Sequence, residues 1–364
     1  MRNLYFGISL ATYRIDYYNF LYEHCDFEII LPLVNPDFCN QEKMERECRF
    51  PIVRADIVKI GHRYVVKGLN DFLKKYTPEV VIVPEFSLNA IQLLVYRKLF
   101  SYKYKVISQC DDSLDMIKGN DFSLYHRISR KYLPRLFDSL ILVNPRVRDW
   151  YQSHFGKGVW FPIIADEVNL RRKLQNVLGR SAELKADYGL ENTNVILFVG
   201  RLLALKNIPL LIRAYSKLKS KSRLVIVGDG EEMETLKSMD SKLKTNIIFT
   251  GRLEAESLYP WYDLANVFCL PSNQEAFGAV VNEALIAGCY TVVSNHAGSA
   301  CLIQENVNGY VFDPGNENAL YSCLLKAMEQ PVNTNEYGLK SNLMNISFGK
   351  ALEMVLPELG LHCN

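Results

Sequence analysis

The chain has 364 residues, 49% of them hydrophobic and 23% charged, and its formal net charge is +2. A single hydrophobic core rarely extends over this length, so the sequence predicts a soluble globular protein of two domains. Residues 1–165 are mildly basic and the remainder is mildly acidic. This asymmetry is too small to indicate nucleic-acid binding, and it leaves open a weak attraction to an anionic membrane surface.

The nine cysteines are scattered, odd in number and without a CxxC pair. This pattern favours reduced thiols over a disulfide framework or a zinc site. No run approaches the ~18 apolar residues of a membrane span, and residues 4–11 are too short and too aromatic for a signal peptide. We therefore expect a cytoplasmic protein, either free in solution or attached to the inner face of the cell membrane.

The first half alternates strands with helices, which favours one parallel, doubly wound sheet. Residues 35–55 carry many charges and little apolar periodicity, so loop and exposed helix are expected there. The spacing predicts strands at the start of 3–9 and over 27–31, 80–84, 104–108, 139–143 and 159–164. It predicts helices over 17–24, 61–76, 88–100 and 125–136.

A second series follows a charged helical segment, 165–192, which is expected to be a linker. Its expected strands cover 195–199, 223–227, 247–249, 266–270 and 290–293, with a hairpin-like segment at 309–312. Its expected helices cover 209–218, 231–239 and 258–262, and a further helix follows Gly278. The fold class is therefore α/β with two Rossmann-like domains, 1–165 and 166–345. Parallel sheets bind ligands at their carboxyl ends, so a shared crevice between the domains is expected.

Two glutamates flank a turn of small residues in the stretch 271–288. Glu275 is expected in a loop after a buried strand, and Glu283 one turn into the next helix. The amides around Phe277, Gly278 and Ala279 would begin that helix unpaired, which is typical of a phosphate site. One carboxylate could hold sugar hydroxyls and the other ribose hydroxyls.

Two cations follow the first strand of the second series. Arg201 and Lys206, after Gly200, could converge on a diphosphate, Arg as a bidentate fork and Lys as a point charge. The alternative is a solvated loop at a strand end. The turn at Gly228 and Gly230 is more typical of chain reversal than of nucleotide binding.

Further candidates follow other strands. Arg252 and Leu253 could lie against a nucleotide base, although that loop is also explained as an ordinary turn. Asp111 and Asp112 follow the strand over 104–108, where an acceptor-ligand role and helix capping are equally supported. A basic helix face over 125–136 is either solvated or a membrane-surface or phosphate-acceptor site. Its cations are Arg127, Arg130, Lys131 and Arg135.

In these features the chain resembles retaining GT-B glycosyltransferases of family 4, the group 1 glycosyl transferases. The resemblance is specific over 195–330, where Pro271 and Ser272 precede Glu275 and Glu283 at the characteristic spacing, and it is vague over the first half. The resemblance is strengthened by the order in which further short motifs occur along the chain. These motifs are at 200–201, 206–207, 228–230, 251–252 and 309–315. The resemblance implies that residues 346–364 supply part of a helix crossing back to the first domain.

The resemblance implies transfer of a hexose-type sugar from a UDP- or GDP-sugar to a saccharide or lipid-linked saccharide, with retention and without metal or other cofactor. Arg201 and Lys206 would neutralise the leaving diphosphate, Glu275 would hold the sugar and Glu283 the ribose. Surface-polysaccharide synthesis is the expected setting. The amides of residues 277–280, which include Val280, would lie near sugar and phosphate.

The acceptor half departs from the family pattern. Gly7 stands alone where a glycine pair is common, Asp111 and Asp112 follow Cys110 where a histidine is usual, and Ser299 replaces an acidic position. Gly7, Arg14 and the two aspartates remain the acceptor-side candidates. The alternatives are a catalytically silent GT-B subunit, against which the intact donor residues argue, and a nucleotide-sugar epimerase.

Overall fold

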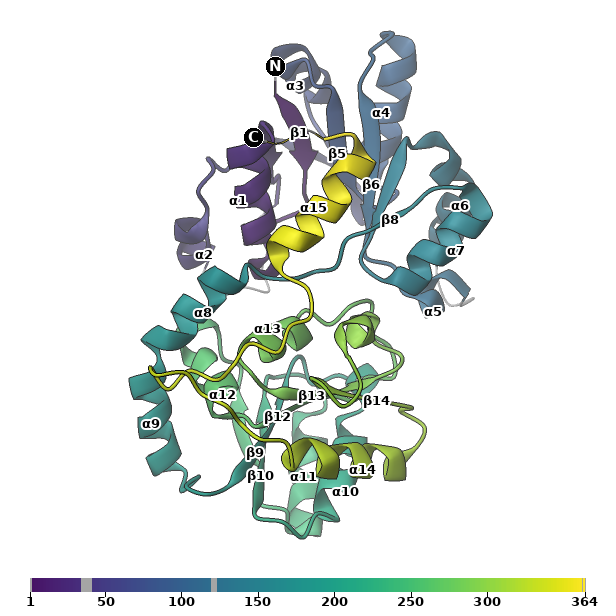
Figure 1. Ribbon diagram of the computed structural model, residues 1–364. Coiled ribbons are helices and arrows are strands. Elements are labelled where there is room, and N and C mark those ends of the chain that lie inside the picture. Colours follow the sequence, from purple (N-terminus) through teal and green to yellow (C-terminus); the bar gives the residue numbers. More distant parts are fainter. Residues whose placement is uncertain (1, 34–40, 119–122, 362, 364) are drawn as a thin grey trace. The chain divides into compact units, whose positions relative to one another are not determined.

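The computed structural model describes residues 2–33, 41–118, 123–361 and 363 (Figure 1). The chain divides into two compact units. Unit 1 contains Met1–Ile163 and Gly349–Asn364, and unit 2 contains Ile164–Phe348. The predicted boundaries, after residues 165 and 345, lie near these junctions.

Unit 1 is built on a six-stranded sheet in the order β2-β1-β5-β6-β7-β8, and every pairing in it is parallel. Its strands match the six predicted ones and are mostly buried, as expected for a sheet covered on both faces. They are β1 (Asn3–Phe6), β2 (Phe27–Ile30), β5 (Val80–Pro84), β6 (Lys105–Cys110), β7 (Ser139–Leu142) and β8 (Val159–Trp160).

The helices of unit 1 lie between these strands in the βαβ manner, except the last, which follows unit 2 (Figure 1). They are α1 (Ile15–His24), α2 (Gln41–Glu47), α3 (Leu69–Tyr76), α4 (Leu88–Leu99), α5 (Leu114–Lys118), α6 (Leu124–Tyr132), α7 (Pro145–Phe155) and α15 (Phe348–Leu359). The short 3-10 turns η1 (Thr12–Arg14) and η2 (Leu133–Leu136) adjoin α1 and α6. Of the loop and helix predicted over 35–55, residues 35–40 lie outside the described residues.

The helix predicted over 61–76 is wrong in its first half. Residues 57–66 form an antiparallel hairpin of β3 (Ile57–Ile60) and β4 (Arg63–Val66), and only α3 is helical. Gly61, with φ of +61°, makes the turn, and Gly68, with φ of +69°, separates β4 from α3. Both conformations favour glycine, and neither can be recognised from apolar spacing alone.

Helix α15 belongs to unit 1, to which the chain returns after Phe348 (Figure 1). Its buried side chains recur along one face at helical spacing. They are Ala351, Leu352, Val355, Leu356 and Leu359.

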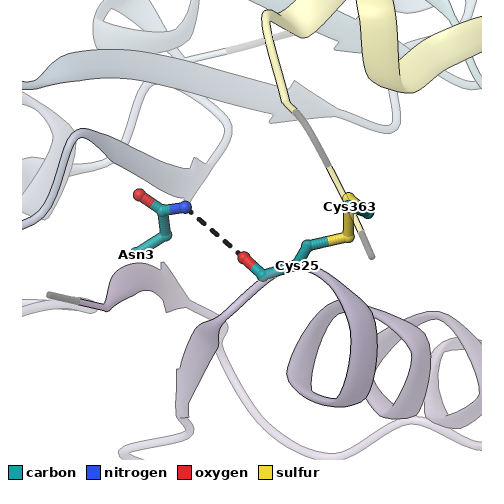
Figure 2. The surroundings of a disulfide bond; sticks show 3 residues. All are labelled: Asn3, Cys25 and Cys363. Atoms are coloured by element: carbon teal, nitrogen blue, oxygen red, sulfur yellow. Dashed lines mark hydrogen bonds between the residues drawn. A yellow bond between two sulfur atoms is a disulfide. The ribbon is translucent and has the colours of Figure 1, made fainter.

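A disulfide joins Cys363, beyond α15, to Cys25 at the end of α1 (Figure 2). The prediction of reduced thiols is therefore wrong for this pair. Asn3 donates a hydrogen bond to the Cys25 carbonyl at 3.4 Å and accepts one from the amide of Val80 at 2.9 Å. The cysteines are 338 residues apart in sequence, so no spacing motif could reveal the bond.

Unit 2 also has a six-stranded parallel sheet, in the order β11-β10-β9-β12-β13-β14. Numbered within the unit, this is the Rossmann order 3-2-1-4-5-6, which reverses direction between β9 and β12. The strands are β9 (Asn194–Val199), β10 (Ser222–Val227), β11 (Ile248–Gly251), β12 (Val267–Leu270), β13 (Tyr290–Ser294) and β14 (Gly309–Phe312). β14 pairs in parallel with β13, so the segment predicted to be hairpin-like is an edge strand.

The segment predicted as a linker instead forms two helices of unit 2. α8 and α9 pack through Leu170, Leu174 and Leu184, three leucines spread thinly along a charged sequence. The helices are α8 (Glu167–Asn176), α9 (Leu178–Asp187), α10 (Ile208–Ser216), α11 (Met233–Leu243), α12 (Tyr259–Leu264), α13 (Val280–Ile286) and α14 (Glu317–Met328). No helix within the described ranges is long and apolar enough to cross a membrane.

Reduction of the disulfide should loosen α15. We expect the α15 amides to exchange hydrogen faster in dithiothreitol than under oxidising conditions, because the bond limits the freedom of the detached segment. Hydrogen exchange followed by mass spectrometry measures this difference. In Cys363→Ser the exchange should be fast in both conditions. If the α15 amides of the unsubstituted protein exchange at the same rate before and after reduction, the disulfide does not hold α15 in place.

Candidate functional site

The loop after β9 is held by close backbone packing. A Cβ atom at Gly228 would lie 1.9 Å from the Gly200 carbonyl oxygen, and one at Gly230 would lie 2.5 Å from that of Leu202. The Leu202 amide also donates to the Asp229 carbonyl at 2.8 Å. The two glycines of the 228–230 turn therefore let this loop approach, which is a structural role.

Lys206 and Glu275 form an ion pair at the carboxyl edge of the sheet. Lys206 ends the 3-10 turn η3 (Ala204–Lys206), and Glu275 lies in the loop after β12. Both side chains are largely buried, at 15% and 16% exposure. The two loops belong to adjacent strands on either side of the strand-order reversal, where open parallel sheets bind ligands.

Main-chain contacts fix the position of the Glu275 loop. The Asn273 amide donates to the Leu205 carbonyl at 2.9 Å, which ties the loop to the segment carrying Lys206. On the other side, the amides of Gly298 and Ser299 donate to the carbonyls of Glu275 and Phe277 at 3.2 and 2.8 Å. Three strand-end loops, after β9, β12 and β13, are thus joined into one surface.

Two glycines make that junction possible. A Cβ at Gly298 would lie 2.2 Å from the Ala276 carbonyl oxygen. Gly278 has φ of +92°, and a Cβ there would lie 2.7 Å from a methyl carbon of Leu270. No other residue type fits either position without moving the loop.

Arg201 lies on the same loop as Lys206 and is exposed. Within the described part of the chain, no carboxylate forms an ion pair with its guanidinium. It therefore retains its full donor capacity for an anionic ligand.

Glu283 lies in α13 and receives a hydrogen bond from the Tyr262 hydroxyl at 2.9 Å. Burial raises the pKa of Glu283 above its ordinary value, and the Tyr262 hydrogen bond opposes that shift. Tyr262 was not among the predicted site residues. Its position two residues before a helix end carried no signal for this contact.

The amides at the start of α13 are available for a ligand. Among the described residues, nothing accepts a hydrogen bond from the amides of Gly278, Ala279 and Val280. Phe277 contributes only its backbone, because its side chain is buried. α13 has seven residues, so its dipole is modest and the amides themselves are the main donors.

Arg252 and Leu253 lie further along the sheet, in the loop after the edge strand β11. Arg252 is paired with Glu254 at 2.6 Å rather than directed to the Lys206–Glu275 pair. The Gly251 carbonyl accepts from the Gly228 amide at 2.8 Å, so this loop adjoins the 228–230 turn.

Two buried hydroxyls near the Glu275 loop were missed by the sequence reasoning. Ser272 and Ser299 are inaccessible to solvent, and their Oγ atoms have no hydrogen-bond partner within the described ranges. The Ser299 Oγ lies near Gly278, 3.0 Å from the position a Cβ would take. Nearby, His296 donates from Nδ1 to the Asn273 carbonyl at 2.8 Å, since a carbonyl can only accept.

In unit 1, Arg14 and Asp111 form an ion pair at the carboxyl ends of β1 and β6. One guanidinium nitrogen of Arg14 lies 2.7 and 2.6 Å from the two carboxylate oxygens of Asp111. Asp111 retains about a third of its side-chain exposure. Gly7 is buried, and a Cβ there would lie 2.4 Å from Leu31.

Asp112 has a structural role instead. Its side chain is fully buried and accepts hydrogen bonds from Arg130 at 2.5 Å and from the Tyr151 hydroxyl at 2.8 Å. No exposed oxygen of Asp112 is left for an acceptor, so Asp111 is the remaining carboxylate candidate. Arg130 also contacts Glu85 at 3.2 Å and points inward, which removes it from the predicted basic surface.

Across the described residues, no three His, Cys, Asp or Glu side chains are grouped as metal ligands. The arrangement in unit 2 instead offers two cations, free amides and two carboxylates around the reversal point. Such a set can hold a phosphate-bearing ligand by its anion and by its hydroxyl groups.

Residues 181–341 match the family model of the group 1 glycosyl transferases. The chain is 27% identical over 234 residues to the amylovoran biosynthesis glycosyltransferase AmsK of Erwinia amylovora, covering 58% of this chain and 56% of that one. It is 27% identical over 201 residues to a GDP-mannose-dependent alpha-(1-6)-phosphatidylinositol monomannoside mannosyltransferase of Mycobacterium tuberculosis, covering 51% and 52%. An uncharacterised glycosyltransferase of Methanocaldococcus jannaschii is 35% identical over 134 residues, covering 36% and 34%.

The chain thus spans about a third to about half of the length of these curated relatives. Solved structures resemble it over more of its length. HepE of Anabaena in complex with UDP has a TM-score of 0.70 at 14% identity and 90% coverage of both chains. The lipopolysaccharide outer core galactosyltransferase WaaB has a TM-score of 0.66 at 14% identity, covering 98% of this chain and all of that one. The fold is GT-B, and the family match supports a GT-B glycosyltransferase.

Gly298→Ala should destabilise the protein, because the new methyl group would overlap the Ala276 carbonyl oxygen. Such overpacking typically costs about 1–3 kcal/mol. Chemical denaturation followed by fluorescence measures the change. The matched control is Gly179→Ala in α9, where a Cβ meets nothing within 4 Å and helix propensity predicts equal or higher stability. Equal stability of Gly298→Ala and the unsubstituted protein would contradict the close contact.

Proposed function

We propose that the protein is a retaining, metal-independent glycosyltransferase of family 4. It would move a hexose-type sugar from a UDP- or GDP-sugar to a saccharide or lipid-linked saccharide acceptor in surface-polysaccharide synthesis. The observation that supports this proposal most directly is the ion pair between Lys206 and Glu275 at the strand-order reversal of unit 2. The exposed Arg201 lies on the same loop as Lys206.

The cations supply the electrostatic part of the mechanism. When the bond between sugar and diphosphate breaks, negative charge grows on the leaving phosphate, and fixed positive groups stabilise that change. Lys206 is already held by Glu275, so little side-chain reorganisation is needed. Arg201 would add a bidentate contact, and the free amides of 278–280 would bind remaining phosphate oxygens. These groups would serve in place of a divalent cation.

The carboxylates would orient the donor. Glu275 would accept hydrogen bonds from hydroxyls of the transferred sugar, and Glu283 from the ribose. Arg252 and Leu253 would contribute toward the base.

Retention requires no dedicated protein base in this proposal. The departing phosphate would take the acceptor proton as the acceptor oxygen attacks from the same face of the sugar. Arg14, Asp111 and Gly7 at the strand ends of unit 1 are the proposed acceptor side.

The names of the relatives support the substrate class. AmsK is named for amylovoran biosynthesis, and the mycobacterial relative is named as a GDP-mannose-dependent mannosyltransferase. HepE was solved with UDP, and also with UDP-glucose. These names support a nucleotide-sugar donor with uridine or guanosine as the base.

Lys206→Ala and Glu275→Ala should each lower the rate of sugar transfer by at least about 100-fold, the usual cost of removing a transition-state electrostatic contact. Transfer of radiolabelled sugar from UDP- and GDP-hexoses to total lipid and glycan acceptors measures the loss. Lys217→Ala is the control, because Lys217 also forms an ion pair with a glutamate, Glu317 on α14, in a more exposed position, and this variant should retain full activity.

The same assay is run with and without EDTA. Equal rates support the metal-independent proposal, and loss of transfer in EDTA contradicts it. Full activity of both site variants would contradict the assignment of the donor site. A protein that binds nucleotide but never transfers sugar would point instead to a catalytically silent subunit.

Nucleotide affinity should fall as the pH is lowered from 7 to 5. Because burial raises the pKa of Glu283, its carboxylate is lost at a higher pH than usual, and with it one acceptor for the ribose hydroxyls. Calorimetric titration with UDP and GDP over this range measures the trend. Glu283→Gln should bind more weakly at pH 7 and show a smaller pH dependence; an unchanged profile in that variant would contradict the ribose contact.

A further inference from the structure

Helix α6 has its amphipathic character reversed. The core-facing side carries Arg130 and Ser129, which are buried, whereas large apolar side chains face solvent. A surface helix in a globular protein normally buries its apolar stripe. The exposed side chains, four residues apart, are Leu124 at 70%, Ile128 at 49%, Tyr132 at 54% and, in η2, Leu136 at 52%.

The inward side of α6 is fixed by polar contacts. Arg130 pairs with the buried Asp112, and the Tyr125 hydroxyl donates to the Phe86 carbonyl at 2.7 Å. These contacts define which side of the helix meets unit 1, so the apolar row cannot turn inward. The adjoining turn η2 contacts α7, where the Arg135 guanidinium lies 4.8 Å from the ring centroid of Phe155. Figure 1 shows α6 and α7 in unit 1.

A row of cations accompanies the apolar row. Arg127, Lys131 and Arg135 are exposed and also four residues apart, one position before Ile128, Tyr132 and Leu136. Within the described residues no carboxylate forms an ion pair with any of the three. The segment 123–136 itself contains no Asp or Glu. Apolar and cationic rows side by side are typical of helices that lie in the headgroup region of a bilayer.

We propose that the outer face of α6 and η2 is a membrane-docking surface for anionic lipids. The apolar row, Leu124, Ile128, Tyr132 and Leu136, enters the boundary between headgroups and acyl chains, while the cationic row contacts lipid phosphates. Tyr132 suits this depth because its ring is apolar and its hydroxyl is polar. The Lys131 ammonium lies 5.2 Å from the ring centroid of Tyr132, so the two rows are in contact.

An anionic bilayer fits this face better than a protein partner does. A helix lying flat on a membrane needs one apolar row bordered by cations, and it needs no complementary shape. The attraction between anionic headgroups and cations that have no carboxylate partner among the described residues acts over the whole row. The inference does not rest on the proposed donor site, because α6 belongs to unit 1 and the donor residues to unit 2.

Co-sedimentation of the full chain with sucrose-loaded vesicles tests the proposal. Vesicles of phosphatidylcholine with 30% phosphatidylglycerol should bind the protein, and vesicles of phosphatidylcholine alone should bind it at least about tenfold more weakly. Sodium chloride at about 0.5 M should weaken the binding, because salt screens exposed charges.

Two double variants measure the contributions of the cationic row and the apolar row to vesicle binding separately. Arg127→Gln with Lys131→Gln should weaken binding to anionic vesicles about 25-fold, from about fivefold for each cation. Leu124→Gln with Ile128→Gln should weaken it about tenfold or more, by removing inserted apolar surface. The controls, in unit 2, are Lys219→Gln with Lys242→Gln and Leu243→Gln with Val307→Gln, which change exposed side chains of the same two kinds and should bind normally.

The proposal is overturned if no vesicle binds, or if the α6 variants and the controls bind alike. It is also overturned if the protein sediments as a dimer that Leu124→Gln with Ile128→Gln dissociates while vesicles remain unbound; the face would then join two copies. Because all the changed residues are exposed, circular dichroism should show an intact fold. UDP or GDP binding, measured separately, reports on the donor site alone.

Discussion

The reversal of strand order between β9 and β12 determines which loops can meet in unit 2. The connections leaving these neighbouring strands run in opposite directions, so the loops carrying Lys206 and Glu275 face one another without a helix between them. Backbone hydrogen bonds then set their separation, and the glycines at 228 and 298 let the neighbouring loops approach. Both side chains of the ion pair are largely buried, so the cost of removing the charges from water offsets much of their attraction, and the pair mainly determines where each charge is held.

The parallel sheets were predictable because most of their strands are buried, continuous apolar runs that alternate with helical periodicity along the chain. The edge strand β14 was predicted only as a hairpin-like segment. The hairpin over 57–66 could not be predicted in this way, since its exposed strands have neither a buried apolar run nor a strict alternation of apolar and polar residues. The role of 165–192 was misjudged for a related reason. A helix needs only a few leucines on one side to pack, and a charged sequence hides them.

The positions of Lys206 and Glu275 were predictable because each follows a strand that ends at the same edge of a sheet. The direction in which each side chain points could not be predicted in this way. Asp111 and Asp112 are adjacent in sequence, yet one faces partly outward and the other is enclosed by Arg130 and Tyr151. That difference depends on the local path of the chain after β6. Likewise, the sequence does not distinguish Arg130 from the neighbouring cations of the basic helix. Only the structure shows that it pairs with the buried Asp112.

The bond between Cys25 and Cys363 makes the polypeptide from one cysteine to the other a closed covalent ring. All of unit 2 lies within that ring, because the chain leaves unit 1 after residue 163 and returns to it at residue 349. Cutting the backbone once inside the ring would therefore yield no separate fragment until the disulfide is reduced. A protease that nicks a loop of unit 2 would leave one covalently connected molecule, with Lys206 and Glu275 still joined to unit 1 through the backbone or the disulfide.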